Sequence, residues 1–355
     1  MRETVAFFMM KRRNFLKTSG AMLSLSLVSS SGFAGVSSNR LIRPKALRPG
    51  DLVGLITPGS PVDEKQLASA EQRIKDLGLR SKAGKNVAKP ASSSDAALQA
   101  NLDDLHAMFR DPEVRAVISV RGGYGSVELL DRINYDLIRR NPKIFVGFSD
   151  ATALHLAIHR NSGLVTFHGN FNSSEYTTAY FRKALFSVQP IGEVSNPAQS
   201  SDSKVPVSKI RAIRPGKASG RIIGGNLTSI SYTMGTPYEI ETRNRILFLE
   251  AVGEEPYHVR RMLNQLRLAK KFDDAAGIVF GVCASCVVPA GKTPYPNTNY
   301  TADEVLDYML GKLKMPVISG LAIGHIADQL TLPLGAKATL DADEGTLTIN
   351  ESGVV

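Results

Sequence analysis

Apolar residues follow two different spacings along the chain from about Ala46 onward. Between short apolar runs, they return at helical spacing, and the first such segment is preceded by Ser60 and Pro61, which predict a helix start. One face of this helix carries Leu67, Ala70, Ile74 and Leu77. The uninterrupted runs predict buried strands at residues 53–56, 116–120, 144–148 and 164–167. This alternation predicts an α/β fold with a largely parallel sheet covered on both faces.

The apolar pattern is interrupted once over a longer stretch. Residues 190–208 are rich in Pro and Ser, lack apolar periodicity, and predict a linker. Beyond this stretch, apolar runs at residues 246–249 and 278–282 flank an amphipathic helical segment. We therefore predict an N-terminal α/β domain at residues 44–189 and a C-terminal β/α domain at residues 209–355.

The N-terminus, residues 1–34, has the pattern of an export signal. Basic residues, among them Arg12 and Arg13, precede a short Ser-diluted apolar stretch and small residues that end at Ala34. This stretch is too short and too polar to span a bilayer, so no stable membrane insertion is expected. The paired arginines are typical of a twin-arginine signal, and a general secretory signal is the alternative. Either route predicts an exported, periplasmic or other extracytoplasmic protein.

Composition and charge limit the kinds of binding partner to expect. The chain has 355 residues with 43% hydrophobic and 21% charged content, which is typical of a globular protein long enough for two domains. Its formal net charge of +10 suits an acidic substrate or an anionic polymer. No dense basic run with interleaved aromatic residues is present, so we expect no nucleic-acid partner. The oligomeric state stays open, and a homodimer is one option.

A candidate nucleophile follows the apolar run at residues 144–148. Ser149 stands in Gly147-Phe148-Ser149-Asp150-Ala151, which has the strand-turn-helix context of a nucleophile elbow, although Ala151 replaces its last Gly. The amide of Asp150, at a helix N-terminus, is a natural donor to a developing oxyanion.

A Gly-rich loop follows the preceding strand. Since the carboxyl ends of parallel strands lie at one edge of a sheet, we expect this loop to line the substrate cleft beside Ser149 and to supply a second oxyanion donor. A plain strand-to-helix turn is the alternative. The residues concerned are Arg121, Gly122, Gly123 and Tyr124.

A serine needs a base, and the base needs an orienting group. His325 follows Gly324 in a loop between apolar runs, where functional residues concentrate. Glu250 ends the strand at residues 246–249, an unusual place for a carboxylate unless a cationic group meets it. The alternative for Glu250 is a surface acid at a strand end.

The remaining histidines and the two cysteines form no recognisable metal-binding motif, and we expect no metal and no cofactor. His155 and His159 are four residues apart on one predicted helix, but the glutamate of a zinc-binding H-E-x-x-H motif is missing. His168, directly after a strand, is either a site-lining residue or a core histidine with satisfied hydrogen bonds. Cys283 and Cys286 lack a second cysteine pair, so they are a structural or an incidental thiol pair rather than a zinc site.

A series of motifs resembles the LD-carboxypeptidase (muramoyltetrapeptide carboxypeptidase) family from about Pro44 to the C-terminus. The resemblance implies that Ser149 is the nucleophile, His325 the general base and Glu250 its orienting residue. It also implies an N-terminal α/β domain and a C-terminal swivelling β/α domain, with the site in the cleft between them. The family removes the terminal D-alanine of murein tetrapeptides, so a murein peptide is the expected substrate. The motifs are Arg121-Gly122-Gly123-Tyr124-Gly125-Ser126, Gly147-Phe148-Ser149-Asp150-Ala151-Thr152, Gly224-Gly225-Asn226-Leu227, Ile246-Leu247-Phe248-Leu249-Glu250, and Gly324-His325 with Leu332-Pro333-Leu334-Gly335-Ala336.

The chain departs from the family pattern at Asn101, Asn170 and Ala251, where Arg, Pro and Asp are common. None of these positions belongs to the Ser, Glu and His set, but each bears on the pocket and hence on the substrate. Two rival functions remain: a microcin C immunity-like peptidase that cleaves an aminoacyl-nucleotide, and a non-catalytic exported protein that binds muropeptides. The absence of Trp weakens the first, because such peptidases stack the base on an aromatic residue such as Trp. The intact Ser, Glu and His set argues against the second.

Overall fold

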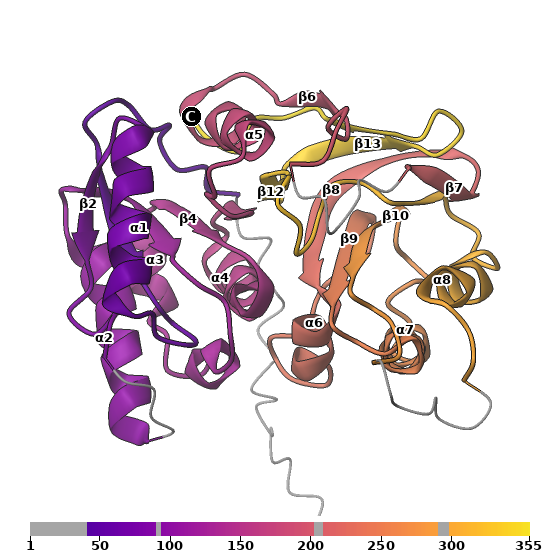
Figure 1. Cartoon of the computed structure of the whole chain (residues 1–355), viewed down its shortest axis with the longest axis horizontal. Helices are drawn as coiled ribbons and strands as arrows, with labels where there is room; N and C mark the ends of the chain where they lie inside the picture. Colours follow the sequence, from indigo (N-terminus) through magenta and orange to yellow (C-terminus); the bar gives the residue numbers. More distant parts are fainter. Residues whose placement is uncertain (1–40, 90–93, 202–208, 290–297) are drawn as a thin grey trace, which may run out of the picture. The chain divides into compact units, whose positions relative to one another are not determined.

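Two β-sheets carry the fold (Figure 1). The structure is a computed structural model and describes residues 41–89, 94–201, 209–289 and 298–355. The predicted export segment, residues 1–34, lies outside the described residues. The described residues belong to one compact unit, Asn39–Val355.

Six strands of the described chain form the first sheet, in the order β12-β5-β4-β3-β1-β2. The strands β1 to β5 pair in parallel, and β12 joins the edge antiparallel to β5. The strands are β1 (Leu52–Ile56), β2 (Arg80–Ala83), β3 (Val114–Ser119), β4 (Ile144–Gly147), β5 (Thr166–His168) and β12 (Leu332–Leu334). Parallel pairing places the carboxyl ends of β1 to β5 at one edge, which is where Ser149 and the Gly-rich loop begin.

Helices cover both faces of the first sheet, as the alternating pattern predicts (Figure 1). Buried side chains of α1 and α5 pack with Val53 and Ile118 on one face. Side chains of α2, α3 and α4 pack with Val117 and Phe145 on the other. The helices are α1 (Glu64–Asp76), α2 (Asp95–Arg110), α3 (Tyr135–Arg140), α4 (Thr152–Ser162) and α5 (Glu175–Phe186). The predicted α/β fold class is confirmed.

Eight strands within the same described ranges form the second sheet, in the order β6-β14-β13-β8-β9-β10-β11-β7. Its centre, β8 to β11, is parallel, and the strands on either side are antiparallel. The strands are β6 (Gly192–Val194), β7 (Arg211–Arg214), β8 (Lys217–Asn226), β9 (Arg245–Val252), β10 (Gly277–Ala284), β11 (Val317–Ser319), β13 (Lys337–Asp341) and β14 (Thr346–Ile349). Three helices accompany it: α6 (Leu227–Thr233), α7 (Pro256–Leu268) and α8 (Ala302–Leu310).

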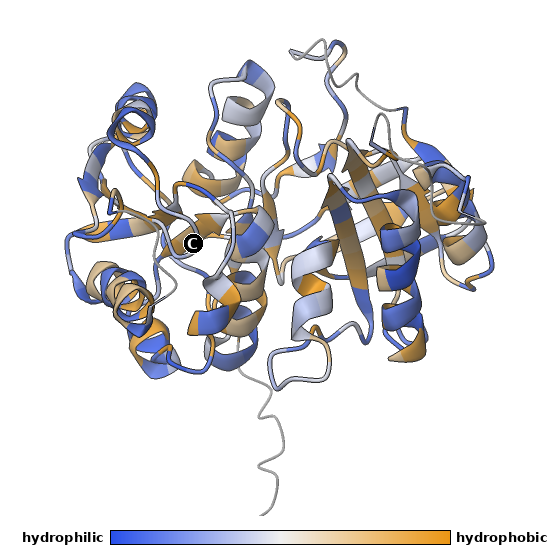
Figure 2. Cartoon of the chain, turned by 60° about the horizontal axis from the view of Figure 1, so that its bottom comes forward, coloured by the Kyte–Doolittle hydropathy of each residue, from blue (hydrophilic) through white to orange (hydrophobic). Residues whose placement is uncertain are grey.

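The hydrophobic core of the second sheet joins its strands to these helices. Leu263 of α7 and Leu310 of α8 are fully buried among Leu247, Phe280 and their neighbours. Figure 2 shows the result as largely orange strands beside helices that carry blue segments. No helix among the described residues is long and apolar enough to cross a membrane.

The chain passes between the two sheets more than once. Gly192–Val194, inside the predicted linker, forms β6 of the second sheet, whereas residues 202–208 of that linker lie outside the described residues. In the opposite direction, Leu332–Leu334 adds β12 to the first sheet. The boundary at residues 190–208 stays a prediction, and residues 209–355 contribute to both sheets.

Candidate active site

Ser149 stands on a strained turn between β4 and α4. Its φ is +60°, in the left-handed region that a residue with a side chain rarely adopts. It begins a short 3-10 helix, Ser149–Ala151, which continues into α4. A Cβ on Gly147 would lie 2.7 Å from the Cβ of Ala151, so the turn holds one small side chain there but not two. The predicted elbow therefore tolerates Ala151 because Gly147 has no side chain.

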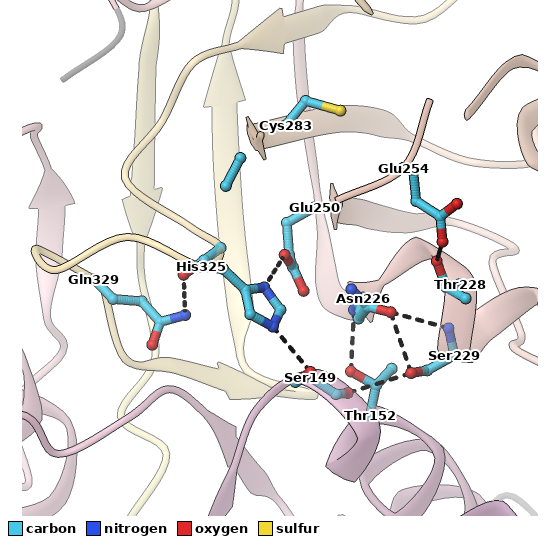
Figure 3. Close-up of polar contacts among 12 residues, drawn as sticks. Ser149, Thr152, Asn226, Thr228, Ser229, Glu250, Glu254, Cys283, His325 and Gln329 are labelled. Atoms are coloured by element: carbon cyan, nitrogen blue, oxygen red, sulfur yellow. Dashed lines mark hydrogen bonds and ion pairs between the residues drawn. The ribbon is translucent and has the colours of Figure 1, made fainter. Parts of the chain in front are cut away.

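Ser149, His325 and Glu250 form one hydrogen-bonded chain (Figure 3). Nε2 of His325 lies 2.9 Å from the Oγ of Ser149, and Nδ1 lies 2.9 Å from Oε2 of Glu250. Glu250 is fully buried in β9, so the alternative of a surface acid is wrong. With Nδ1–H donating to the carboxylate, Nε2 is left to accept the serine proton. The structure thus brings together the three residues predicted as catalytic.

The backbone beside Glu250 requires glycine. Gly324 has a φ of +130°, and a Cβ there would lie 3.1 Å from the carbonyl oxygen of Val282 and 3.2 Å from Oε2 of Glu250. Any other residue would press on the carboxylate that holds His325. On its open side, the imidazole packs against Phe148, with ring centroids 5.2 Å apart.

Gln329 ties the His325 loop to the first sheet, a role that sequence analysis missed. Its Nε2 donates to the carbonyl oxygen of Gly324 at 2.6 Å (Figure 3), and its Oε1 accepts from the amide of Asn170 at 2.9 Å. Its own amide donates to Oγ1 of Thr177 at 2.8 Å. Gln329 is fully buried, although it follows Asp328 in a polar stretch, so its place in the sequence carries no clear signal of its role.

Gln329→Met is expected to lower kcat for the catalysed reaction about 10- to 100-fold with little change in KM. The variant frees the carbonyl of Gly324 and the amide of Asn170, and a displacement of His325 of about 1 Å costs up to this much. Unpaired buried groups also cost about 1–3 kcal/mol each, so the melting temperature should fall. Steady-state kinetics below the melting transition separate the two effects. An equal change in the exposed Gln72→Met control, or a loss confined to KM, would contradict the role.

The Gly-rich loop lies directly against the nucleophile, as predicted. A Cβ on Gly122 would lie 2.7 Å from the Cβ of Ser149 and 3.3 Å from the amide nitrogen of Asp150. Ser60 fixes the loop, because its amide donates to the carbonyl of Gly122 and its Oγ accepts from the amide of Tyr124, both at 3.2 Å. Ser60 is therefore a loop tether, and the helix begins later in the chain.

Four loop positions were expected to line the site. Gly123 takes the left-handed region, with a φ of +99°, and packs so close to Ser60 that a Cβ would clash with its side chain. The side chain of Tyr124 is 67% exposed, and Arg121 is also exposed, with its carbonyl accepting from Oγ of Ser119 at 2.8 Å. Of the four, Gly122 is the position shown directly against Ser149.

Asp150 contributes its backbone rather than its carboxylate to the site. Its Oδ2 accepts from the amide of Ser126 at 2.9 Å, and its carbonyl accepts from the Oγ of Ser126 at 2.6 Å. Burial raises the pKa of the Asp150 carboxyl, although the hydrogen bonds from Ser126 act against this. The side chain therefore holds the turn, and the amide remains the candidate oxyanion donor.

Gly122→Val should lower kcat by about 10²-fold or more, because the new side chain would displace Ser149 and the amide of Asp150, the candidate oxyanion donor. Melting temperature and kcat measured on the same preparation distinguish a catalytic effect from a general one. We expect the activity loss to exceed what the change in stability explains. Full activity in this variant would remove the loop from the site.

Asn226 links the second sheet to the nucleophile turn, and sequence analysis assigned it no role. Its amide donates to Oγ1 of Thr152 at 3.0 Å, and its Oδ1 accepts from the amide of Ser229 at 3.0 Å (Figure 3). The hydroxyl of Ser229 in turn donates to the carbonyl of Ser149 at 3.4 Å. In β8, Asn226 lies directly opposite Glu250 of β9. The two sheets thus meet at the turn that carries the nucleophile.

Of the other histidines, His155 and His168 are fully buried, and His159 is partly buried beside them. His155 contacts the carbonyl of Gly147, and His159 contacts that of Leu164. Burial lowers the pKa of each of these two histidines to about 4, so both are neutral near pH 7. His168 is fully buried against Phe248. Its ring nitrogens have no hydrogen-bond partner among the described residues, so it is a core histidine whose hydrogen bonds are not satisfied.

Metal-binding side chains do not gather elsewhere in the part of the chain that the structure describes. Within these residues, no group of three or more His, Cys, Asp or Glu side chains could hold an ion. Cys283 and Cys286 form a disulfide at the end of β10, with Cys283 beside Ala251 of β9. Of a structural and an incidental thiol pair, the two possibilities for these cysteines, the disulfide supports the structural pair.

Comparisons with known proteins agree over most of the chain. The LD-carboxypeptidase N-terminal domain of peptidase family S66 matches residues 53–169, and its C-terminal domain matches residues 219–340. A probable murein peptide carboxypeptidase of Bacillus subtilis is 40% identical over 316 residues, which are 88% of this chain and 95% of the relative.

Solved structures show the same fold. A MccF-like protein from Bacillus anthracis has a TM-score of 0.76 at 30% identity and covers 87% of this chain and 99% of its own. A muramoyltetrapeptide carboxypeptidase from Oxalobacter formigenes has a TM-score of 0.69 at 27% identity, with coverage of 85% and 98%. Both domain models match, the Bacillus subtilis relative is similar over most of its length, and the solved structures share the fold. The chain therefore belongs to the LD-carboxypeptidase family, peptidase S66.

Proposed function

We propose that the protein is a serine carboxypeptidase that hydrolyses the L,D-peptide bond of murein tetrapeptides and releases the terminal D-alanine. The observation that carries the proposal is the chain from Ser149 through His325 to the buried Glu250, with 2.9 Å at each step. The murein peptide carboxypeptidase among the relatives supports the substrate class. Binding alone would not require a nucleophile, a base and an orienting carboxylate.

In this mechanism, Oγ of Ser149 attacks the scissile carbonyl carbon while Nε2 of His325 takes the serine proton. Glu250 holds the Nδ1–H tautomer and stabilises the imidazolium that forms. The amide of Asp150, with a donor from the Gly-rich loop, stabilises the negative charge on the carbonyl oxygen. His325 then protonates the leaving amine of D-alanine. A water molecule, deprotonated by His325, hydrolyses the acyl-enzyme and restores Ser149.

Incubation of the mature protein with a murein tetrapeptide, followed by mass spectrometry, tests the proposal. We expect one equivalent of free D-alanine and one of tripeptide. The matched control is the same peptide with a terminal L-alanine, which should not be cleaved. Binding of the tetrapeptide without D-alanine release would instead favour the non-catalytic muropeptide-binding function.

A second candidate is a microcin C immunity-like peptidase, favoured by the likeness to the MccF-like structure. The same assay with an aminoacyl-nucleotide distinguishes it. The chain contains no Trp to stack on a base, and the exposed Tyr124 is the aromatic residue of the Gly-rich loop. Cleavage of the nucleotide conjugate at a higher kcat/KM than the tetrapeptide would replace the proposed function with this one.

We also propose export through the twin-arginine route to the periplasm or another extracytoplasmic site. The pattern of residues 1–34 supports it, and the disulfide between Cys283 and Cys286 is of the kind that persists in an oxidising compartment. Changing Arg12 and Arg13 to Lys should leave unprocessed precursor in the cytoplasm, because Lys keeps the charge and loses the planar guanidinium. Cell fractionation with immunoblotting measures this. Normal processing of the Lys-Lys form would indicate the general secretory route.

A further inference from the structure

Two cavities are lined by opposite ends of the Gly-rich loop, whose Gly122 abuts Ser149. Tyr124 and Gly125 line a cavity of about 500 Å³, and Arg121 lines another of about 690 Å³. Both volumes are in the range of small-molecule sites. Because Gly122, between these residues, abuts Ser149, a peptide that reaches the nucleophile has a cavity on either side.

The larger cavity is basic. Lys65 and Arg73 enter it from α1, and Arg121 enters it from the loop. Lys65, Ser69 and Arg73 follow one another at four-residue spacing, so they share one face of the helix. Among the described residues that line the cavity none is acidic, and none of the three cations forms an ion pair with a described carboxylate. This cavity therefore presents three positive charges without a protein counterion.

Residues that line the basic cavity also contact His325 or the loop that carries it. Phe148 lines it and packs its ring against His325. Asn170 lines it and donates its amide to Gln329, and Asn172 donates its side-chain amide to the carbonyl of Ala327 at 2.6 Å. A ligand held in this cavity is therefore held in register with the imidazole.

The smaller cavity differs in charge and gives an internal comparison. It is lined by both Lys89 and Glu128, so its charges offset each other. The family departure at Asn101 lies in this cavity, and the one at Asn170 lies in the basic cavity. Both departures thus line cavities that the Gly-rich loop also lines.

We propose that Lys65, Arg73 and Arg121 form a subsite that binds a carboxylate of the substrate peptide; this inference rests on the proposed function. Guanidinium and ammonium groups without a counterion bind carboxylates through charge-assisted hydrogen bonds. A murein tetrapeptide brings the terminal carboxylate of D-alanine and, where its third residue is diaminopimelate, a side-chain carboxylate. Lysine at that position ends in an amine, as diaminopimelate does, but adds no carboxylate. If the subsite binds the carboxylate of the third residue, it selects a diaminopimelate peptide over a lysine peptide. If it binds that of D-alanine, it selects a free over an amidated C-terminus.

Calorimetry with the Ser149→Ala protein tests the subsite without turnover. Four tetrapeptides are compared, with diaminopimelate or lysine at the third position and with a free or an amidated C-terminus. The peptide that presents the recognised carboxylate should bind about tenfold more tightly than its counterpart without it. Lys65→Met and Arg73→Met should each remove most of that difference. Lys75→Met, on the same helix but outside the cavity, should keep it.

The pair of peptides that differs identifies the carboxylate, on the third residue or on the D-alanine. Equal affinity for all four peptides would overturn the inference, and so would a preference that survives in the Lys65→Met/Arg73→Met double variant. Turnover by the wild-type protein is scored separately. D-alanine release without any carboxylate preference would contradict the subsite and support the proposed function. A carboxylate preference without D-alanine release would support the subsite and contradict the proposed function.

Discussion

Ser149→Ala is expected to reduce kcat for D-alanine release by about 10⁶-fold, the largest effect of any single substitution. The variant removes the only atom that attacks the carbonyl in the proposed mechanism. His325 and Glu250 remain in place, but they have no hydroxyl proton to move. Single-turnover mass spectrometry at high enzyme concentration measures the residual rate. No acyl-enzyme should accumulate.

Two controls accompany this variant. Ser219→Ala, on β8 far along the strand from Asn226, should keep full activity, and Ser149→Ala itself should keep its melting temperature and its affinity for the tetrapeptide. Near wild-type turnover by Ser149→Ala would show that another group is the nucleophile and that the chain through His325 serves only stability.

Glu250→Gln should lower kcat by about 10⁴-fold with the fold intact. An amide in place of the carboxylate can donate to Nδ1, which leaves the proton of the neutral imidazole on Nε2, facing Ser149, where it cannot act as a base. The buried site would also lose the negative charge that stabilises the imidazolium. The measurement is kcat together with the melting temperature.

Residues that act as one unit have effects that do not add. The Ser149→Ala/Glu250→Gln double variant should therefore be little slower than Ser149→Ala alone. Glu193→Gln, in β6 of the second sheet, is the matched acid-to-amide control and should retain activity. Additive losses in the double variant would separate Glu250 from the catalytic unit.

The sequence was most informative where local pattern decides structure. Apolar runs predicted strands at 53–56, 116–120 and 144–148, and the structure has β1, β3 and β4 there. It also has Ser149 directly after β4 and the Gly-rich loop after β3. These positions follow from the alternation of strands and helices, because parallel strands bring their carboxyl ends to one edge.

Predictions from local sequence were wrong or incomplete where a residue forms hydrogen bonds with a distant part of the chain. Ser60 was expected to begin the first helix, and this prediction is wrong: Asp63 is the N-cap, in a reciprocal capping box with Gln66, because Ser60 bonds the Gly-rich loop instead. The resemblance to the family, not the spacing, joined Ser149 to His325 across 176 residues. Gln329 escaped notice because two of its three partners, Asn170 and Thr177, are 159 and 152 residues away in the sequence.

The edge strand β12 has a consequence for the order in which the protein can be completed. During synthesis, β5 leaves the ribosome long before Leu332–Leu334, so the sheet that carries Ser149 has an unpaired edge at β5 until these residues have been made. His325 and Gln329 lie a few residues before this strand and are made at the same late stage. The part of the chain that closes the edge therefore also brings His325 to Ser149, so a chain that has not reached it has Ser149 without its hydrogen-bond partner. The complete set of Ser149, His325 and Glu250 exists only once this late segment has folded.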